Sequence, residues 1–454
     1  MRPSKPQHWI VLGGAGLSIL LVAILVSASV ARSGAWANPA PLPTLSPDGR
    51  LLEIDSLRGQ RPTQALYHLE ALAAQVGWSP DLHKLAGDIH GQLGDLQSAQ
   101  FHWEQAPQDD PQTLRALSER YIEQGRWNTA TTTLNALLSL QPDLPWANYH
   151  LGMILAPYDP VRAEPHLAQA VLASEFSETA RAVRVTLLEN RDSTVRDGVG
   201  LPVLVGLTLI DHEAWRYAEL AFLYANALYE AANDAPLPEA LAYASLAQNR
   251  LGKDGTQAIA TAVILQPQDP QIRFLEALHY RHIGAYNTSL DIMIQAVALA
   301  PESPTLFAEL GTAYRLTGEL EQAEYWLRAA VGFSENDPQF QELLAQFYAQ
   351  EAYNLGGDGL AALNSIMQNN PEDPELLAGM GWAFYQLGDR EEGEAFIDQA
   401  LVVAPSNPRA LYYKARVLLG RGGNDQEAIT LLETVTATDN VFTEAAQRIL
   451  ITLQ

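Results

Sequence analysis

The stretch SPTLFAELGTAYRLTGELEQAEYWLRAAVGF, residues 303–333, decides the fold. Its first half carries Phe307, Leu310, Gly311 and Tyr314 at relative offsets 0, 3, 4 and 7. These offsets place all four residues on one face of a helix with about 3.6 residues per turn. We therefore expect the first half of the stretch to form a helix with one buried side.

The second half of the stretch repeats this pattern after a break at Gly318. Ala323, Leu327 and Ala330 are spaced i, i+4 and i+7 and form a second apolar stripe. Gly311 and Ala323 are expected to lie where the two helices cross, because only a small residue lets two backbones approach closely. The stretch thus predicts a helix–turn–helix unit.

Prolines recur along the chain with the period of this unit. Pro267 and Pro301 are 34 residues apart, and so are Pro371 and Pro405. Each of them follows an apolar, alanine-rich stretch that ends in a short polar turn. A fixed period of this size indicates small units stacked into a solenoid rather than folded around one globular core.

The pattern resembles the tetratricopeptide repeat (TPR), which carries W-x2-L-G-x2-Y, then A-x3-F, then a closing proline. The resemblance implies an all-α fold, a right-handed α-solenoid of about ten TPR-like helix-turn-helix repeats over residues 62–454. Three further copies place apolar and small residues at the family's offsets. These are Leu114, Leu117, Ser118, Tyr121, Ala130, Leu134, Leu137 and Pro142; Leu377, Met380, Gly381, Phe384, Gly393, Ile397, Ala400 and Pro405; and Val205, Gly206, Leu209, Ala218, Phe222 and Ala225.

Some copies depart from the pattern. The copy between Pro338 and Pro371 has a Gly356-Gly357-Asp358-Gly359 insertion in its turn. The stretch from Pro236 to Pro267 matches the pattern of the second helix, but its match to the first helix is poor. The repeats nevertheless leave no gap that could house a separate catalytic domain.

The N-terminal region predicts a membrane anchor. Residues 9–31 are uncharged and mostly apolar, long enough for a helix that crosses a hydrocarbon core of roughly 30 Å. Arg2 and Lys5 precede this segment, and no acidic residue occurs before Asp48. The positive-inside tendency places residues 1–8 in the cytoplasm and the solenoid outside the cell membrane.

Cleavage of the same segment as a signal peptide is the alternative, because Ala35-Trp36-Ala37 fits a small-x-small cleavage site. The solenoid would then be secreted or periplasmic. Residues 32–61 are predicted to form a linker in either case, because Pro39, Pro41, Pro43 and Pro47 favour an extended path.

The charge balance argues against nucleic acid as a partner. The chain has a formal net charge of −25. Its first forty residues contribute three positive charges and no negative one, so the remainder carries −28. Nucleic-acid binding needs a basic surface, which this composition does not offer. The acidic residues serve solubility, or alternatively attract a basic partner.

No residue pattern predicts catalysis, a cofactor or a metal. His279 and His282, spaced i and i+3, and His83 and His90, two turns apart, lack the further ligands of a metal site. The sequence contains no Gly-x-Ser-x-Gly element and no Walker sequence. We therefore expect a non-catalytic protein without a cofactor.

The resemblance implies that first helices line a concave face that binds a partner. Aromatic residues and arginines at the corresponding positions would suit a peptide, because these types dominate interface energetics. The candidates are Phe274, Arg281, Arg315, Trp382, Tyr385, Arg409, Tyr412 and Arg416, and Leu278 falls in the same register. The alternative is that Trp382 and Tyr385 pack against the neighbouring repeat.

One binding mode of the family is not implied by this sequence. Family members that bind chaperone tails use a Lys and Asn clamp, and the matching positions of the first repeat are Lys84 and Asp88. The second clamp residue is thus absent, so carboxylate-tail binding does not follow from the resemblance.

The combined expectation is a membrane-tethered, non-catalytic scaffold that binds a protein or peptide on the concave face of its solenoid. One alternative is a secreted or periplasmic binding protein. Another is an accessory subunit of an envelope enzyme or polysaccharide export complex.

Overall fold

The computed structural model describes residues 46–190, 199–334, 337–351, 353–369, 371–422, 425–438, 440 and 442–453. Over these ranges the chain forms twenty-four α-helices, one short π-helical turn and no strand, which confirms the all-α prediction. None of the helices within these ranges is long and apolar enough to cross a membrane. The helix predicted at residues 9–31 lies outside them, as do residues 1–8. The right-handed sense of the solenoid stays a prediction.

The chain divides into two compact units, residues 1–151 and residues 152–454. In the first unit α2 packs on α3, α4 on α5, and α6 on α7. The helices of this unit are α2 (Pro47–Arg58), α3 (Pro62–Val76), α4 (Pro80–Gln92), α5 (Leu96–Trp103), α6 (Pro111–Glu123), α7 (Trp127–Leu140) and the first part of α8 (Pro145–Leu155).

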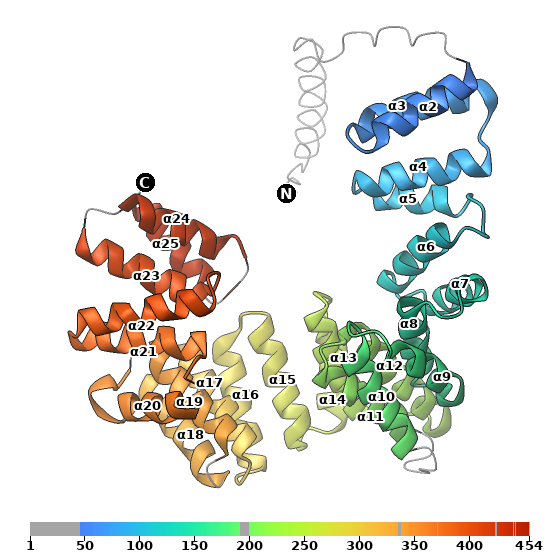
Figure 1. The fold of residues 1–454 in the computed structure, drawn as a ribbon. Coiled ribbons are helices and arrows are strands. Elements are labelled where there is room, and N and C mark those ends of the chain that lie inside the picture. The colour runs from blue at the N-terminus through green and yellow to red at the C-terminus, as the bar shows by residue number, and fades with distance from the viewer. Residues whose placement is uncertain are drawn as a thin grey trace, which may run out of the picture. The chain divides into compact units, whose positions relative to one another are not determined.

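Consecutive helices of the second unit also pair, from α11 with α12 to α23 with α24 (Figure 1). After the end of α8 its helices are α9 (Pro160–Ala170), α10 (Ser177–Glu189), α11 (Gly200–Asp211), α12 (Trp215–Asn233), α13 (Pro238–Arg250), α14 (Thr256–Leu265), α15 (Pro270–His282), α16 (Tyr286–Leu299), α17 (Pro304–Thr317), α18 (Leu320–Phe333), α19 (Pro338–Glu351), α20 (Leu360–Asn369), α21 (Pro374–Leu387), α22 (Arg390–Val403), α23 (Pro408–Arg421), α24 (Asp425–Thr436) and α25 (Thr443–Leu453). First helices also contact each other, as α21 contacts α19 and α23, so the pairs stack.

Part of the linker predicted over residues 32–61 is helical. Residues 47–58 form α2, which packs on α3 through the fully buried Ile54. Ser46 caps this helix by accepting a hydrogen bond from the Gly49 N–H, and Pro47 suits its first turn. Pro47, which was predicted to favour an extended linker, is thus the first residue of a helix.

The repeating prolines have a structural role that the period alone did not reveal. Each of the turns after α14, α16, α20 and α22 contains a second proline, which stands at the first position of the next helix, where a missing N–H costs nothing. The residue before it caps that helix. In one such turn Asp373 accepts hydrogen bonds from the N–H groups of Glu375 and Leu376 at 2.8 and 3.3 Å.

Within a pair, the turn between helices depends on glycine. Gly284 and Gly318 occupy the same place in successive repeats and have φ angles of +77° and +83°. A Cβ is disfavoured in this left-handed region, so glycine ends the first helix at little cost. This position agrees with the expected break at Gly318.

Helix crossings are close enough to exclude a side chain, as predicted. A Cβ on Gly311 would lie 2.7 Å from Leu327 Cγ and 3.1 Å from the Ala323 carbonyl oxygen. At the equivalent Gly381 it would lie 2.5 Å from the Gly393 carbonyl oxygen. At Gly381 the obstructing atom belongs to the backbone and has no rotamer by which to move away, so this crossing requires glycine.

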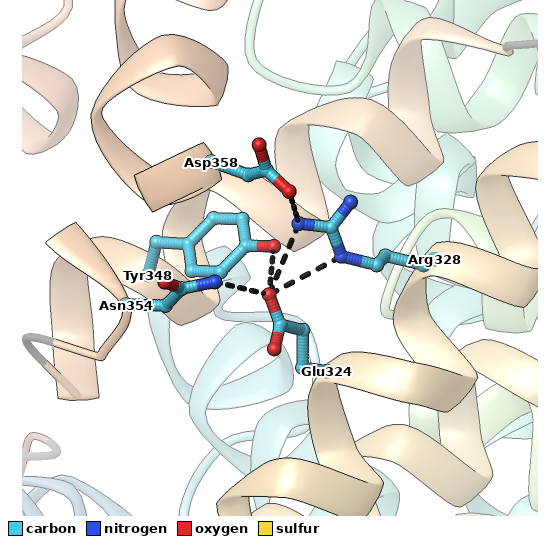
Figure 2. Close-up of polar contacts among 5 residues, drawn as sticks. All are labelled: Glu324, Arg328, Tyr348, Asn354 and Asp358. Atoms are coloured by element: carbon cyan, nitrogen blue, oxygen red, sulfur yellow. Dashed lines mark hydrogen bonds and ion pairs between the residues drawn. The ribbon is translucent and has the colours of Figure 1, made fainter. Parts of the chain in front are cut away.

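The Gly356–Gly359 insertion forms the π-helical turn η1 (Leu355–Gly359) and is anchored to the preceding repeat (Figure 2). Glu324 of α18 accepts hydrogen bonds from the Tyr348 hydroxyl at 2.6 Å and the Asn354 amide at 2.9 Å. Arg328 donates to Glu324 and, at 2.6 Å, to Asp358 in the turn. Burial raises the pKa of Glu324, but the hydrogen bonds from Tyr348, Asn354 and Arg328 outweigh it and leave the pKa below its ordinary value.

Replacement of Gly381 by alanine should locally destabilise α21 and α22. The added methyl group meets backbone atoms, and overpacking of this kind costs about 1–3 kcal/mol. Gly332→Ala is the matched control, because nothing lies within 4 Å of a Cβ there and the helix gains up to about 1 kcal/mol. Native-state hydrogen exchange should show faster exchange in α21–α22 for the first variant only. Equal protection in both variants would contradict the close crossing.

Replacement of Glu324 by alanine should release the inserted turn. The change leaves the buried Tyr348 hydroxyl without its acceptor, which costs about 1–3 kcal/mol, and removes one of the two acceptors of Arg328. Limited proteolysis should then cut the Leu355–Gly359 turn faster than in the native chain. Glu321→Ala, an exposed glutamate on the same helix, controls for loss of charge. Unchanged cleavage in Glu324→Ala would show that the network does not hold the turn.

Candidate functional site

A pocket of about 380 Å³ lies on the stacked first helices of the second unit. Arg315 of α17, Glu351 of α19, Trp382 of α21, and Tyr412 and Arg416 of α23 line it. Phe442 and Ala445, before and within α25, complete the lining together with Gln350, Gln386 and Tyr413. Four successive repeats and the C-terminal helix thus contribute to one pocket.

The aromatic wall of the pocket is also a packing contact between repeats. Trp382 stacks on Tyr413 of the next first helix, with 4.9 Å between ring centroids and 8° between ring planes. Tyr385 also stacks on Trp382, with 5.6 Å between ring centroids, and Trp382 is only 4% exposed. Burial raises the pKa of Tyr413 to about 12, so this hydroxyl stays neutral at physiological pH.

Arg416 is the distinctive polar group of the pocket. Its guanidinium lies 4.4 Å from the centroid of the Trp382 ring and 5.9 Å from that of Tyr412. Among the described residues, no carboxylate lies within ion-pairing distance of Arg416. Arg315, by contrast, is neutralised by Glu351 at 3.2 Å. The exposed Arg416 therefore keeps its donors available beside an apolar surface.

The structure brings together four of the eight residues proposed for the groove, namely Arg315, Trp382, Tyr412 and Arg416. Tyr385 lies behind the wall, stacked on Trp382. Arg409 is buried, with Nε 2.9 Å from a Glu375 carboxylate oxygen.

The remaining two candidates lie in an earlier repeat. Arg281 pairs with Glu309 at 2.8 Å. Phe274 packs against two hydrophobic clusters, and its neighbour in the predicted register, Leu278, packs against one of them. These positions do not line the pocket.

Six of the ten lining residues were not identified from the sequence, among them Glu351 and Phe442. Glu351 belongs to the repeat with the inserted turn, where the family register was hard to apply. Phe442 lies outside any first-helix register, just before α25, yet its ring stacks on Tyr412 at 5.0 Å. A search for aromatic residues one helix beyond the last clear repeat would have found it.

The positions that match the family's carboxylate clamp are occupied within the chain. Lys84 pairs with Asp110 at 2.7 Å, and Asp88 accepts a hydrogen bond from the Trp103 indole at 3.0 Å. His279 is buried and lies within hydrogen-bonding distance of Asn249 and Thr256. Over the described ranges, no group of three or more His, Cys, Asp or Glu side chains gathers in a metal-binding arrangement.

A larger cavity of about 520 Å³ lies elsewhere in the second unit, among α11, α12, α13 and α15. Its lining is apolar and acidic, with Glu239 and Asp269 beside Tyr243. The Tyr243 hydroxyl already accepts a hydrogen bond from Gln271 at 3.2 Å. We favour the Arg416 pocket, because its cation is accessible and has no counter-ion among the residues that the structure describes.

Stability measurements should distinguish the pocket residue that joins neighbouring repeats from the one that is available for binding. Trp382→Ala removes a buried ring from the contact between α21 and α23 and should cost about 3–5 kcal/mol. Arg416→Gln removes an exposed cation–π contact and should cost about 1 kcal/mol or less. Chemical denaturation monitored by circular dichroism measures the free energy of unfolding of each variant. Similar losses in both variants would contradict this assignment.

Comparison with known proteins connects these repeats to a family. The family model of the tetratricopeptide repeat matches residues 274–339 and 378–440. The chain is 24% identical over 427 residues to cellulose synthase operon protein C of Pseudomonas fluorescens (strain SBW25), covering 87% of this chain and 31% of that protein. It is 27% identical over 173 residues to tetratricopeptide repeat protein 16 of Homo sapiens, covering 33% of this chain and 20% of that protein. The chain thus spans less than a third of either relative's length.

A crystal structure of a tetratricopeptide repeat protein from Parabacteroides merdae ATCC 43184 is also similar, at 16% identity and a TM-score of 0.46. The match covers 56% of this chain and 99% of that one. The matched segments span the helix pairs α15–α18 and α21–α24, whose crossings and turns are described above. Residues 274–339 and 378–440 therefore carry tetratricopeptide repeats.

Proposed function

We propose that this chain is a non-catalytic scaffold that holds a segment of a partner protein in the Arg416 pocket. The observation that carries the proposal is an accessible guanidinium on an aromatic wall, with no carboxylate partner in the described part of the chain. Interfaces are enriched in arginine and aromatic anchors of this kind. Tetratricopeptide repeats in general serve as interaction scaffolds, which supports a binding role rather than catalysis.

The chemistry of the pocket favours a segment with an apolar side chain next to a carboxylate. Tyr412, Phe442 and Trp382 line the pocket with aromatic rings. A carboxylate can accept hydrogen bonds from Arg416 in the fork geometry that suits this pair. Glu351 neutralises Arg315, so one carboxylate on the partner balances the charge of the pocket.

The overall charge of the chain limits the partner further. A formal net charge of −25 repels a strongly acidic protein at a distance. The proposed partner therefore presents its carboxylate within a neutral or basic surface. A neutral or basic surface on the partner is also electrostatically compatible with the acidic exterior of the scaffold.

We further propose that the scaffold is tethered to the cell membrane through residues 9–31, with the repeats outside the cytoplasm. The uncharged apolar run and the preceding Arg2 and Lys5 support this topology. Cleavage after Ala37 is the rival outcome, and N-terminal sequencing of the mature protein distinguishes the two.

A second candidate function is that of an accessory subunit in a polysaccharide-synthesising or polysaccharide-exporting complex. The similarity to cellulose synthase operon protein C extends over 87% of this chain and favours this candidate. In such a complex the repeats would hold an enzyme or export component rather than act on sugar themselves. The scaffold mechanism is the same, and only the identity of the partner differs.

Affinity capture of the full chain from gently solubilised membranes tests the proposal. Arg416→Gln should reduce recovery of the bound partner about tenfold, because a hydrogen bond to a charged group contributes about 1.5–3 kcal/mol. Arg390→Gln is the matched control, since Arg390 is also exposed and lies over an aromatic ring, that of Tyr385, but outside the pocket. This control should retain the partner.

Equal recovery by all three proteins would place the binding surface elsewhere and overturn the pocket assignment. Recovery of an enzyme of polysaccharide synthesis, lost with Arg416→Gln, would favour the second candidate. Recovery of an unrelated protein that depends on Arg416 would support the general scaffold alone.

A further inference from the structure

The cavity of about 520 Å³ among α11, α12, α13 and α15 differs in chemistry from the Arg416 pocket. Its volume lies in the range of about 300–1,000 Å³ that is typical of ligand sites. Apolar side chains form half of the lining, and the polar half includes Tyr229, Tyr243, Glu239 and Asp269. The lining residues that the structure describes include no lysine, arginine or histidine. We call this site the acidic cavity.

The tyrosine wall of the acidic cavity is held in place by its neighbours. Phe222 stacks on Tyr243, with 5.2 Å between ring centroids and 13° between ring planes. The Gln271 amide donates a hydrogen bond to the Tyr243 hydroxyl at 3.2 Å. The turn before α13 is fixed by the Leu237 N–H, which donates to the Asn226 side-chain oxygen at 2.8 Å. A site that is ordered before binding loses less conformational entropy when a ligand enters.

One carboxylate of the acidic cavity is fixed by the backbone of α15. Oδ1 of Asp269 accepts hydrogen bonds from the N–H groups of Gln271 and Ile272 at 2.8 and 3.1 Å. Its other oxygen, Oδ2, has no hydrogen-bond partner among the described residues. Asp269 therefore has a defined position and keeps one oxygen available as an acceptor for a ligand.

Several carboxylates act on the same point of the cavity. Burial and the charges of Glu239, Asp269 and Asp211 raise the pKa of the Tyr243 hydroxyl, against the opposing effect of the hydrogen bond from Gln271. A negative charge on the tyrosine is thus disfavoured, which indicates a negative electrostatic potential there. A negative potential beside tyrosine rings favours a cation, which the ring faces also attract.

We propose that the acidic cavity binds an arginine side chain that a partner protein presents between apolar residues. The planar guanidinium can donate to a carboxylate in a fork geometry and stack on a tyrosine ring, which a lysine ammonium cannot do. The aliphatic stem and the neighbouring apolar side chains of the partner suit the apolar half of the lining. The formal net charge of −25 on the chain favours the approach of a basic segment. The inference does not depend on the Arg416 pocket.

A competing explanation assigns the two carboxylates to their helices alone. Asp269 caps α15, and Glu239 lies in the first turn of α13, where a negative charge stabilises a helix. The cavity would then take an apolar ligand or none. The two explanations differ in whether the charge of the ligand matters.

Fluorescence anisotropy of the full-length protein with a labelled peptide tests the proposal. The peptide carries one arginine between two leucines and has blocked termini, and a matched peptide carries citrulline, which has the same shape without the charge. The arginine peptide should bind at least about tenfold more tightly, because two partly exposed ion pairs contribute up to about fivefold each. Neither peptide has a carboxylate, so a negative result leaves the affinity-capture test of the Arg416 pocket unaffected.

Conservative variants locate the binding within the chain. Asp269→Asn removes the charge and keeps the cap, because asparagine caps helices as well as aspartate does. This variant and Glu239→Gln should each weaken binding of the arginine peptide about fivefold. Asp373→Asn is the matched control, because Asp373 caps α21 through the same two kinds of hydrogen bond but lies outside the cavity. It changes the net charge equally and should bind the peptide as the native chain does.

Circular dichroism shows whether each variant remains folded. If one variant unfolds, the other and the comparison of the two peptides on the native chain still decide the result. Equal affinity for the two peptides, or binding of neither, would overturn the proposal. So would Asp269→Asn and Glu239→Gln proteins that bind the arginine peptide as tightly as Asp373→Asn does, because the attraction would then come from the net charge alone.

Discussion

The fold depends on how closely the two helices of each repeat approach. At Gly381 a single added carbon would lie 2.5 Å from the carbonyl oxygen of Gly393. Because both partners at this crossing are backbone, no rotamer change can accommodate a larger residue. The close crossing fixes the angle and the register of the pair. Every repeat that keeps a small residue here presents its first helix to the next repeat in the same way.

That regular presentation explains why a binding pocket can form without any dedicated domain. Arg315, Glu351, Trp382 and Arg416 come from four successive first helices, and a stack of such helices places their side chains along one face. The pocket is a consequence of repetition combined with local variation in sequence. Trp382 has two roles in this arrangement. Its ring stacks on Tyr413 of the next first helix, and the Arg416 guanidinium lies over the same ring at the pocket.

Periodic features could be predicted from the sequence, and features that depend on one irregular element could not. The apolar stripes of residues 303–333, the break at Gly318 and the small residues at the crossings follow from local spacing. The helix α2 was missed because Pro47 favours both an extended linker and the first turn of a helix. Phe442 was missed because the register of repeats ends before it. The acidic cavity depends on how α11, α12, α13 and α15 pack together, which no spacing within one helix encodes.

The position of Arg416 shows why exposure decides which pocket residue carries specificity. Trp382 and Tyr413 are almost completely buried, so a change in either disturbs the contact between repeats before it alters binding. Arg409 is buried too, and its charge is paired with Glu375. Arg416 contacts the same aromatic wall but lies at its surface, so its replacement leaves the contact between α21 and α23 in place. In a stack of repeats, stability therefore resides in the rings that join neighbours, and recognition resides in the side chains laid over those rings.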